Sequence, residues 1–592
     1  MKKVLALILA LALCLSLAAC SSSTDTTTAA GTEAATEAAK TEAATEAKTD
    51  AATEAATEAP TEEATEAPEP AAEQVYTTYI GAEPSSLDVS RRSDSYSSTI
   101  LINTMESLVR CELVGDAYEI MPGDAQSWEV DDTGAVWTFH LNPNAKWSDG
   151  EPITADQYVY SLQRSSAPET GCPNAFFLEP IKNFSAVNKG EMALEELGVK
   201  ALDPQTLQIT LEAPLPAYLD MLSATIYYPQ RQDIVEKYGE AYGTEAENMV
   251  YSGPFKVVSW THNSSIELEK NDQYWDADKV KLTKVTYKII EDVNTQLNAF
   301  QAGDIDSITV ADIETSNMLE QDPTNELHLY PGSTISYAFF NCADPLFQNV
   351  NIRKAFTLAI DREDINEMCF GSLRTPTYGW VCPSISVDGV NFREYVGDTI
   401  KDMTDELTAS GKTAKDLLLQ GMQELNLGDD PSTLDVTFSL AGTSDWYRTL
   451  GEYLQQIYLS ELGVNLKLTF NEWGIFYDNV EKGNYQIGFM GWGNYYNDPY
   501  DTLSLFVGST NAICTNWANA EYDALIDKGA HELDGKARIE IYKQAEDMII
   551  RDECVVSPFA TNNYYTFAKS YVKNFPTGAF NSAGLKYVEI AK

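Results

Sequence analysis

Short segments with alternating apolar and polar residues recur after residue 74, and this period-two pattern predicts β-strands. The predicted strands cover 75–80, 136–141, 207–211, 255–260, 266–269, 282–290, 434–440 and 464–470. Between them, apolar residues recur at the three- and four-residue spacing of an amphipathic helix. The predicted helices cover 155–164, 295–301, 351–360, 414–425, 446–459, 520–529 and 536–550. Because strands and helices alternate, the sequence predicts a mixed α/β fold.

The first twenty residues have the pattern of an export signal. A short basic segment precedes an almost unbroken apolar run over 4–17, which is too short to span a bilayer as a helix. The sequence Leu-Ala-Ala-Cys follows and ends at Cys20. It resembles the lipobox of bacterial lipoproteins, which implies that Cys20 receives the lipid and that 1–20 is a lipoprotein signal. The alternative is an ordinary cleavage site that precedes a cysteine.

Residues 21–73 form a low-complexity segment of repeated Thr, Glu and Ala with almost no large apolar side chains. Such a segment cannot bury enough apolar surface to offset its chain entropy. It predicts a disordered acidic tether between the membrane and a globular part that begins at residue 74.

The composition of the chain argues against several classes of function. The chain has 592 residues, 44% of them hydrophobic, and a formal net charge of -49. That charge argues against nucleic acid as a partner, since such binding needs clustered Lys and Arg. Only four His occur, and no spacing typical of a zinc site, nucleotide loop or catalytic serine is present. We therefore expect no metal, no cofactor and no enzymatic activity.

Seven cysteines remain beyond Cys20, and an odd number cannot all pair internally. Buried free thiols are one interpretation, and a disulfide between Cys369 and Cys382 is another.

A series of short motifs, in an order and at spacings typical of one protein family, extends through the whole globular part. They include Gly-Ala-Glu-Pro-Ser-Ser-Leu-Asp at 81–88, Ala-Lys-Trp-Ser-Asp-Gly at 145–150, Ser-Gly-Pro-Phe at 252–255, Ala-Ile-Asp-Arg at 359–362 and Glu-Tyr-Asp-Ala-Leu-Ile at 521–526. In this order they resemble the extracytoplasmic solute-binding proteins of family 5, the oligopeptide- and dipeptide-binding lipoproteins of peptide ABC importers.

The resemblance implies a periplasmic-binding-protein-like α/β fold of class II (cluster C), bilobal, with three domains. Domain I would be discontinuous and combine 74–106, 226–330 and 555–592; the extra domain II would cover 107–225 and domain III 331–554. The ligand would lie between domains I and III, which close around it.

The resemblance also implies a function. The protein would be a monomer held by lipid on the outer face of the cell membrane, in a bacterium of the Gram-positive type. It would capture oligopeptides or dipeptides and deliver them to membrane permeases driven by cytoplasmic ATPases. Import of an oligosaccharide or another neutral solute, and sensing of a peptide pheromone, remain alternatives, as does a surface hydrolase.

The family meets the ligand's α-ammonium with an Asp in the pattern Trp-x-x-Asp-Tyr-x-[Asp/Glu]-Pro. The corresponding segment here is 492–499, and Tyr495 occupies the position of that Asp. Because a buried ammonium without a partner is costly, three possibilities stay open. Asp498 or Asp501 meets the amine, Asn494 accepts its hydrogen bond, or the ligand has no free α-amine.

The same region is rich in aromatic residues, which form flat walls for apolar groups and sugar rings. Together with the positions above, the predicted ligand-contacting residues are Phe177, Tyr337, Phe339, Trp473, Tyr477, Phe489, Trp492, Asn494, Tyr495, Tyr496 and Asp498. Packing in the core or between domains is the competing interpretation for each ring.

Overall fold

The computed structural model describes residues 73–115, 117–508, 512–580 and 584–591, all of which belong to one unit, Ala67–Lys592. The predicted signal, Cys20 and the predicted tether up to residue 72 lie outside the described residues.

The first lobe contains two four-stranded sheets. One has the order β1 (Val75–Ile80), β10 (Lys284–Ile289), β9 (Ser265–Lys270), β8 (Phe255–Thr261), and the other β4 (Ala125–Val130), β5 (Val136–Leu141), β7 (Thr206–Thr210), β6 (Val199–Asp203). Two strand pairs accompany them, β2 (Val109–Val114) with β3 (Ala117–Pro122) and β20 (Val572–Lys573) with β21 (Glu589–Ile590). A single hydrophobic cluster underlies both four-stranded sheets, so they pack as one lobe.

The helices of this part of the chain are mostly short. They are α1 (Ser95–Thr104), α2 (Ala155–Ser166), α3 (Phe184–Asn188), α4 (Tyr218–Met221), α5 (Gln232–Tyr238), α6 (Val293–Ala302) and α7 (Ile313–Glu320).

The second lobe is built on a mixed sheet. Its strands follow the order β11 (Ser307–Val310), β19 (Val556–Lys569), β12 (Asn325–Phe340), β18 (Ile487–Gly493), β16 (Val436–Leu440), β17 (Leu466–Phe470), and β13 (Arg374–Pro376) also pairs with β19. A small hairpin joins β14 (Ser386–Val387) to β15 (Val390–Asn391). Two further hydrophobic clusters pack on this sheet.

Helices flank that sheet. They are α8 (Val350–Leu358), α9 (Arg362–Phe370), α10 (Phe392–Val396), α11 (Thr399–Ala409), α12 (Ala414–Glu424), α13 (Asp445–Leu462), α14 (Trp473–Glu481), α15 (Pro499–Leu503), α16 (Ala520–His531) and α17 (Gly535–Asp547).

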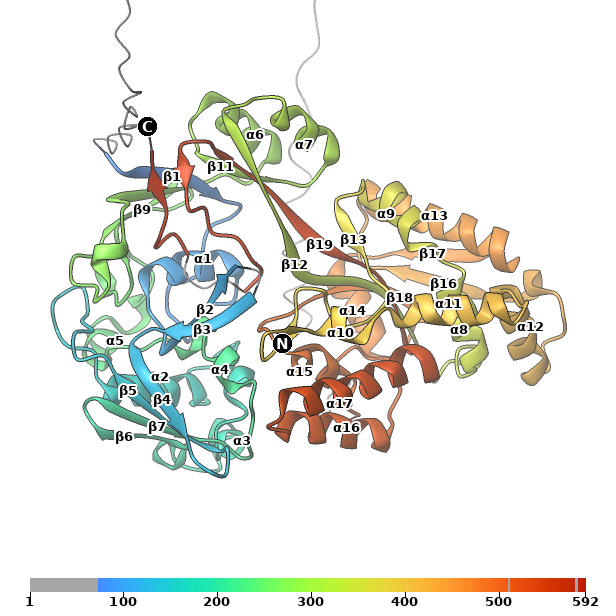
Figure 1. The fold of residues 1–592 in the computed structure, drawn as a ribbon, viewed down its shortest axis with the longest axis horizontal. Helices are drawn as coiled ribbons and strands as arrows, with labels where there is room; N and C mark the ends of the chain where they lie inside the picture. Colours follow the sequence, from blue (N-terminus) through green and yellow to red (C-terminus); the bar gives the residue numbers. More distant parts are fainter. Residues whose placement is uncertain (1–72, 116, 509–511, 581–583, 592) are drawn as a thin grey trace, which may run out of the picture. The chain divides into compact units, whose positions relative to one another are not determined.

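The long strands β12 and β19 connect the lobes. Figure 1 shows them running side by side from the end near β11 to the end near β18 of the same sheet. Their register shifts between Pro331 and Ile335 and again between Ser336 and Tyr337. A Cβ on Gly332 would lie 2.3 Å from the Asn562 side chain, so that side chain packs over residue 332 where a larger residue would displace it. These irregularities interrupt the ladder between the lobes, and such interruptions bend a strand pair locally.

The alternation pattern located the half-buried strands well, because β1, β5, β7 and β17 each have one face toward the core. It did not predict β18 or β19. Both contain runs of consecutive buried residues, and a strand covered on both faces loses the period-two signal.

Candidate ligand-binding site

One edge of β18 is unpaired over its last residues. The strand pairs with β12 from Ile487 to Gly493, whereas on its other side β16 pairs only as far as Phe489. No strand of the described residues pairs with the outer edge from Met490 to Gly493. Main-chain groups on such an edge can bind an added extended chain.

Asn494 follows this edge and has an unused acceptor. Its Nδ2 donates to Ser333 O at 2.6 Å and to Cys382 Sγ at 3.2 Å, which orients the amide. Its buried Oδ1 has no partner among the described residues. An orphaned acceptor is costly unless a ligand or water satisfies it. The Oδ1 of Asn494 is therefore an acceptor that either a buried water or a donor group of a ligand would satisfy.

Three aromatic residues come together beside Asn494, and they belong to different lobes. The Tyr495 ring lies edge-on to Phe177, with centroids 5.0 Å apart, and to Trp492 at 6.3 Å. Tyr495 is 51% exposed and the Trp492 Nε1 has no partner among the described residues. Phe177 is only 7% exposed and also packs in the first-lobe cluster. The structure thus brings Phe177, Trp492 and Tyr495 into one group with a free donor and an exposed ring.

Two carboxyl groups follow in the chain, and both have internal partners. Asp498 pairs with Arg538 and accepts from Tyr500 N at the start of α15, so its role here is structural and it is not free to bind an amine. Asp501 accepts from Tyr495 N at 2.6 Å. Burial raises the pKa of Asp501 to about 7, so this carboxyl is partly protonated near neutral pH.

Trp473 and Tyr477 form a stacked pair on α14, with ring centroids 5.6 Å apart. Trp473 is 54% exposed. The helix starts just after β17, and Thr443, just after β16, donates to Glu472 at 3.0 Å. The pair therefore lies at the carboxyl ends of the parallel strands β16, β17 and β18, where ligands of open α/β sheets bind.

The remaining predicted residues lie in the core. Tyr337 and Phe339 are fully buried, and Phe489 and Tyr496 are 3% and 6% exposed. Tyr337 packs edge-on against Trp380, with centroids 4.8 Å apart. Because other core side chains surround these four rings, their burial supports a role in packing rather than in ligand contact.

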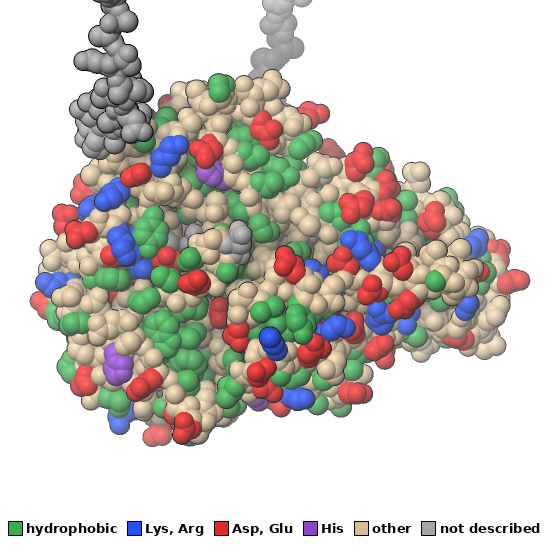
Figure 2. All heavy atoms as spheres, viewed as in Figure 1, with side chains coloured by type: hydrophobic (Ala, Val, Ile, Leu, Met, Phe, Trp, Pro, Cys, Tyr) green, Lys and Arg blue, Asp and Glu red, His purple; other side chains and the backbone are tan. Residues whose placement is uncertain are grey.

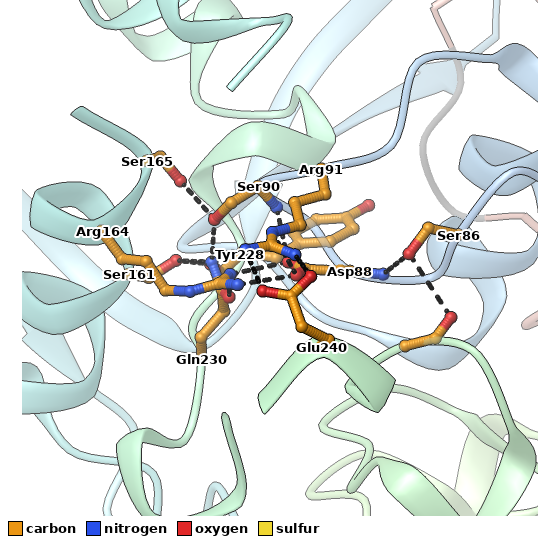
Figure 3. Close-up of polar contacts among 11 residues, drawn as sticks. Ser86, Asp88, Ser90, Arg91, Ser161, Arg164, Ser165, Tyr228, Gln230 and Glu240 are labelled. Carbon is orange, nitrogen blue, oxygen red and sulfur yellow. Dashed lines mark hydrogen bonds and ion pairs between the residues drawn. The ribbon is translucent and has the colours of Figure 1, made fainter. Parts of the chain in front are cut away.

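A polar network within the first lobe holds the segment after β1 against α2 (Figure 3). Arg164 on α2 binds both carboxylate oxygens of Asp88 at 2.7 Å and Gln230 at 2.6 Å. Gln230 in turn donates to Ser90 and Ser161. The network fixes 86–92 against α2, and Asn174, three residues before Phe177, donates to Arg92 O.

Sequence reasoning missed this network and the contact between Arg374 on β13 and Ser336 on β12. Asp88 belongs to the motif at 81–88, but its ion-pair partner Arg164 is distant in sequence, so no local pattern indicated the pair. Cys369 and Cys382 are both free.

Among the described residues no helix is long and apolar enough to cross a membrane, and no cluster of His, Cys, Asp and Glu could hold a metal ion. Figure 2 shows acidic side chains spread over the visible face, with basic ones interspersed and no continuous basic patch.

Comparison with known proteins identifies the family. Residues 119–513 match the model of bacterial extracellular solute-binding proteins, family 5. The dipeptide-binding protein DppE of Bacillus subtilis is 33% identical over 484 residues, which cover 82% of this chain and 86% of DppE. The probable deoxycholate-binding protein YgiS of Escherichia coli is 28% identical over 508 residues, covering 86% and 91%.

Among solved structures, OppA of Haemophilus influenzae in complex with the peptide RPPGFSPFR superposes with a TM-score of 0.71 at 25% identity, covering 88% of this chain and all of that one. The chain therefore belongs to family 5 of the bacterial extracellular solute-binding proteins. It has their bilobal α/β fold, and it is a binding protein and not an enzyme.

Proposed function

We propose that this protein captures short peptides outside the cell membrane and delivers them to the permease of an ABC importer. The observation that carries the proposal is the open edge of β18 beside Asn494, whose Oδ1 lacks a partner among the described residues. An extended peptide on this edge gains main-chain hydrogen bonds that do not depend on its sequence. Relatives named for dipeptide and oligopeptide binding support this ligand class.

The peptide amine would be met differently from the family pattern. Tyr495 stands where a carboxylate is expected, and Asp498 is paired with Arg538. The neutral Asn494 Oδ1 and the nearby main chain would accept its hydrogen bonds. Phe177, Trp492 and Tyr495 would cover the first ligand residues, while Trp473 and Tyr477 would flank the ligand farther along.

Transport would follow from bending at β12 and β19. The register shifts near Pro331 allow the lobes to close over the ligand, and the permease would recognise the closed form. The domain limits 74–106, 226–330 and 555–592 for domain I, 107–225 for domain II and 331–554 for domain III are part of this proposal, and so is action as a monomer.

The direct test is mass spectrometry of small molecules that co-purify with the protein, followed by thermal unfolding with peptide and oligosaccharide panels. A ligand at one hundred times its Kd stabilises the folded state by about 2.7 kcal/mol. We expect short peptides to raise the Tm. If no peptide does so and another solute does, the peptide assignment is wrong.

A neutral or otherwise amine-free solute is the second candidate. Two observations favour it: Tyr495 replaces the amine-binding carboxylate, and a relative is named for deoxycholate binding. Acetylation of the peptide amine distinguishes the candidates. Equal affinity for acetylated and free peptides would show that the amine is not recognised.

The lipid anchor at Cys20 is also part of the proposal. We expect wild-type protein in the membrane fraction and Cys20→Ser in the soluble extracytoplasmic fraction. A serine variant that stays with the membrane would overturn the anchor.

A further inference from the structure

The two lobes also meet away from the strands β12 and β19, where the segment 213–221 of the first lobe contacts the helices α15 to α17 of the second. The ring Nδ1 of His531, at the end of α16, lies 2.5 Å from the main-chain oxygen of Pro214. Tyr496 and Ala530 belong to the second lobe but are buried in the hydrophobic cluster of the first. These contacts hold the lobes together without a ligand.

Both ring nitrogens of His531 face an acceptor. A main-chain oxygen only accepts, so Nδ1 must carry a hydrogen to bond to Pro214. Nε2 lies 3.4 Å from a carboxylate oxygen of Asp527, one turn earlier on α16. A neutral ring has one N–H and can satisfy one of these acceptors, whereas the imidazolium ion has two and satisfies both. Protonation of His531 therefore strengthens the hydrogen bond between the lobes, and the positive charge adds to its strength.

Asp220 on α4 brings a carboxyl group of the first lobe to the same interface. The titratable and charged groups close to it are Asp388, Asp498 and Arg538 of the second lobe and the Cys111 thiol of the first. Arg538 already forms an ion pair with Asp498, so it compensates Asp220 only in part. Burial and the charge of Asp498 raise the pKa of Asp220 to about 8, and this carboxyl is mostly protonated at neutral pH.

A second set of carboxylates meets at the Tyr500 ring on α15. Burial raises the pKa of Tyr500, and the charges of Glu179 in the first lobe and Asp527 in the second add to this effect. Carboxylates of both lobes therefore lie near one phenol. The chain has a net charge of -49, so ionised groups on the two sides repel each other when the lobes meet. Proton uptake at the interface reduces this repulsion.

We propose that this interface is a proton-dependent latch, in which protonation of His531 and Asp220 favours the closed arrangement of the lobes. The inference goes beyond the proposed function, because it concerns the lobes themselves and does not depend on which solute binds.

The direction of the pH effect follows from proton linkage. When the lobes separate, water replaces the second-lobe groups around Asp220, and its pKa moves from about 8 toward the value of about 3.9 for a solvated Asp. The closed form therefore binds this proton more tightly, and closure weakens as pH rises toward 8. His531 acts in the same direction, because histidine loses its charge between about pH 5 and 8.

The test is small-angle scattering of the ligand-free protein from pH 5.5 to pH 8.5 at constant ionic strength. We expect the radius of gyration of the wild type to increase with pH. Asp220→Asn imitates the protonated carboxyl, so its radius at pH 8.5 should exceed its radius at pH 5.5 by no more than half of the wild-type increase. His531→Phe loses the hydrogen bond to Pro214 and should already be expanded at pH 5.5. A merely structural role would not move the two variants in opposite directions.

Two matched controls separate the latch from a general effect of charge. Asp156→Asn removes an exposed carboxylate from α2 of the first lobe, and His140→Phe replaces the partly exposed histidine of β5. Both should follow the wild-type curve. Thermal unfolding at each pH establishes that every variant is folded. A wild-type radius that does not change with pH would overturn the latch, and so would variants of Asp220 and His531 that behave like the controls.

Discussion

At the scale of single residues, the proposed site depends on groups whose hydrogen-bonding capacity is unused. Asn494 Oδ1 and Trp492 Nε1 are buried without partners among the described residues, whereas Asp498, the carboxylate beside them, is committed to Arg538. An unused polar atom costs stability in the free protein, and a ligand that satisfies it recovers this cost on binding.

Trp492→Ala should weaken ligand binding by about tenfold, which corresponds to about 1.4 kcal/mol. The ring is half-buried and contacts Tyr495, so its loss removes ligand contact without opening the core. Titration calorimetry with the best-binding peptide measures the effect, and urea unfolding should stay cooperative.

Trp275→Ala is the matched control for this change. That ring is also half-buried with an unpartnered Nε1, but it packs on the first-lobe cluster. Its loss should leave the affinity unchanged. If both variants bind normally, Trp492 is not part of the site.

Asp501 predicts a pH dependence of stability. Its pKa is raised to about 7 in the folded protein by burial, against about 3.9 in an unfolded chain. The folded state therefore holds the proton more tightly, and the free energy of unfolding should fall as pH rises from about 4 to about 7, by at most about 4 kcal/mol.

Asp501→Asn should remove this pH-dependent contribution. The free energy of unfolding of the variant minus that of wild type should therefore be larger at pH 8 than at pH 4. Urea unfolding at pH 4, 6 and 8 measures the difference. Asp272→Asn, at an exposed position, should keep the wild-type slope. Parallel curves for wild type and Asp501→Asn would contradict the prediction.

At the scale of elements, two features position the site. β16 pairs with β18 only as far as Phe489, and this leaves the edge of the proposed site open. The Asp88–Arg164 pair ties the segment after β1 to α2 (Figure 3). Its side chains are 1% and 11% exposed, so neither charge can be hydrated if the other is lost.

Asp88→Asn should destabilise the protein by about 3–5 kcal/mol, because it leaves the buried Arg164 without its counter-charge. Glu240→Ala serves as the control. Glu240 pairs with Arg91 on the surface, where its side chain is 89% exposed, and solvent screens that pair. We expect the unfolding midpoint of Glu240→Ala to stay near the wild-type value. Similar midpoints for the two variants in urea would show that the Asp88 pair contributes little.

At the scale of the whole molecule, the lobes are joined by the long strands β12 and β19, whose ladder is irregular near Pro331. If these strands bend at the irregularity, each lobe would move as a rigid body.

Small-angle scattering should therefore show a smaller radius of gyration at saturating peptide than without it. Trp492→Ala at the same peptide concentration should give a smaller decrease, because less of it is bound. An unchanged radius in wild-type protein with a demonstrated ligand would rule out closure.

Sequence by itself determined the fold class and the half-buried strands, and it directed attention to the segment 492–499 as the centre of the proposed site, because periodicity and local motifs depend on neighbouring residues. Tertiary structure decided the rest. Tyr337 and Phe489 are buried in the core, and Asp498 forms an ion pair with Arg538. Arg374 donates a hydrogen bond to Ser336 and has no carboxylate partner among the described residues. These outcomes depend on which distant segments pack together, and burial and charge pairing between such segments leave no local pattern along the chain.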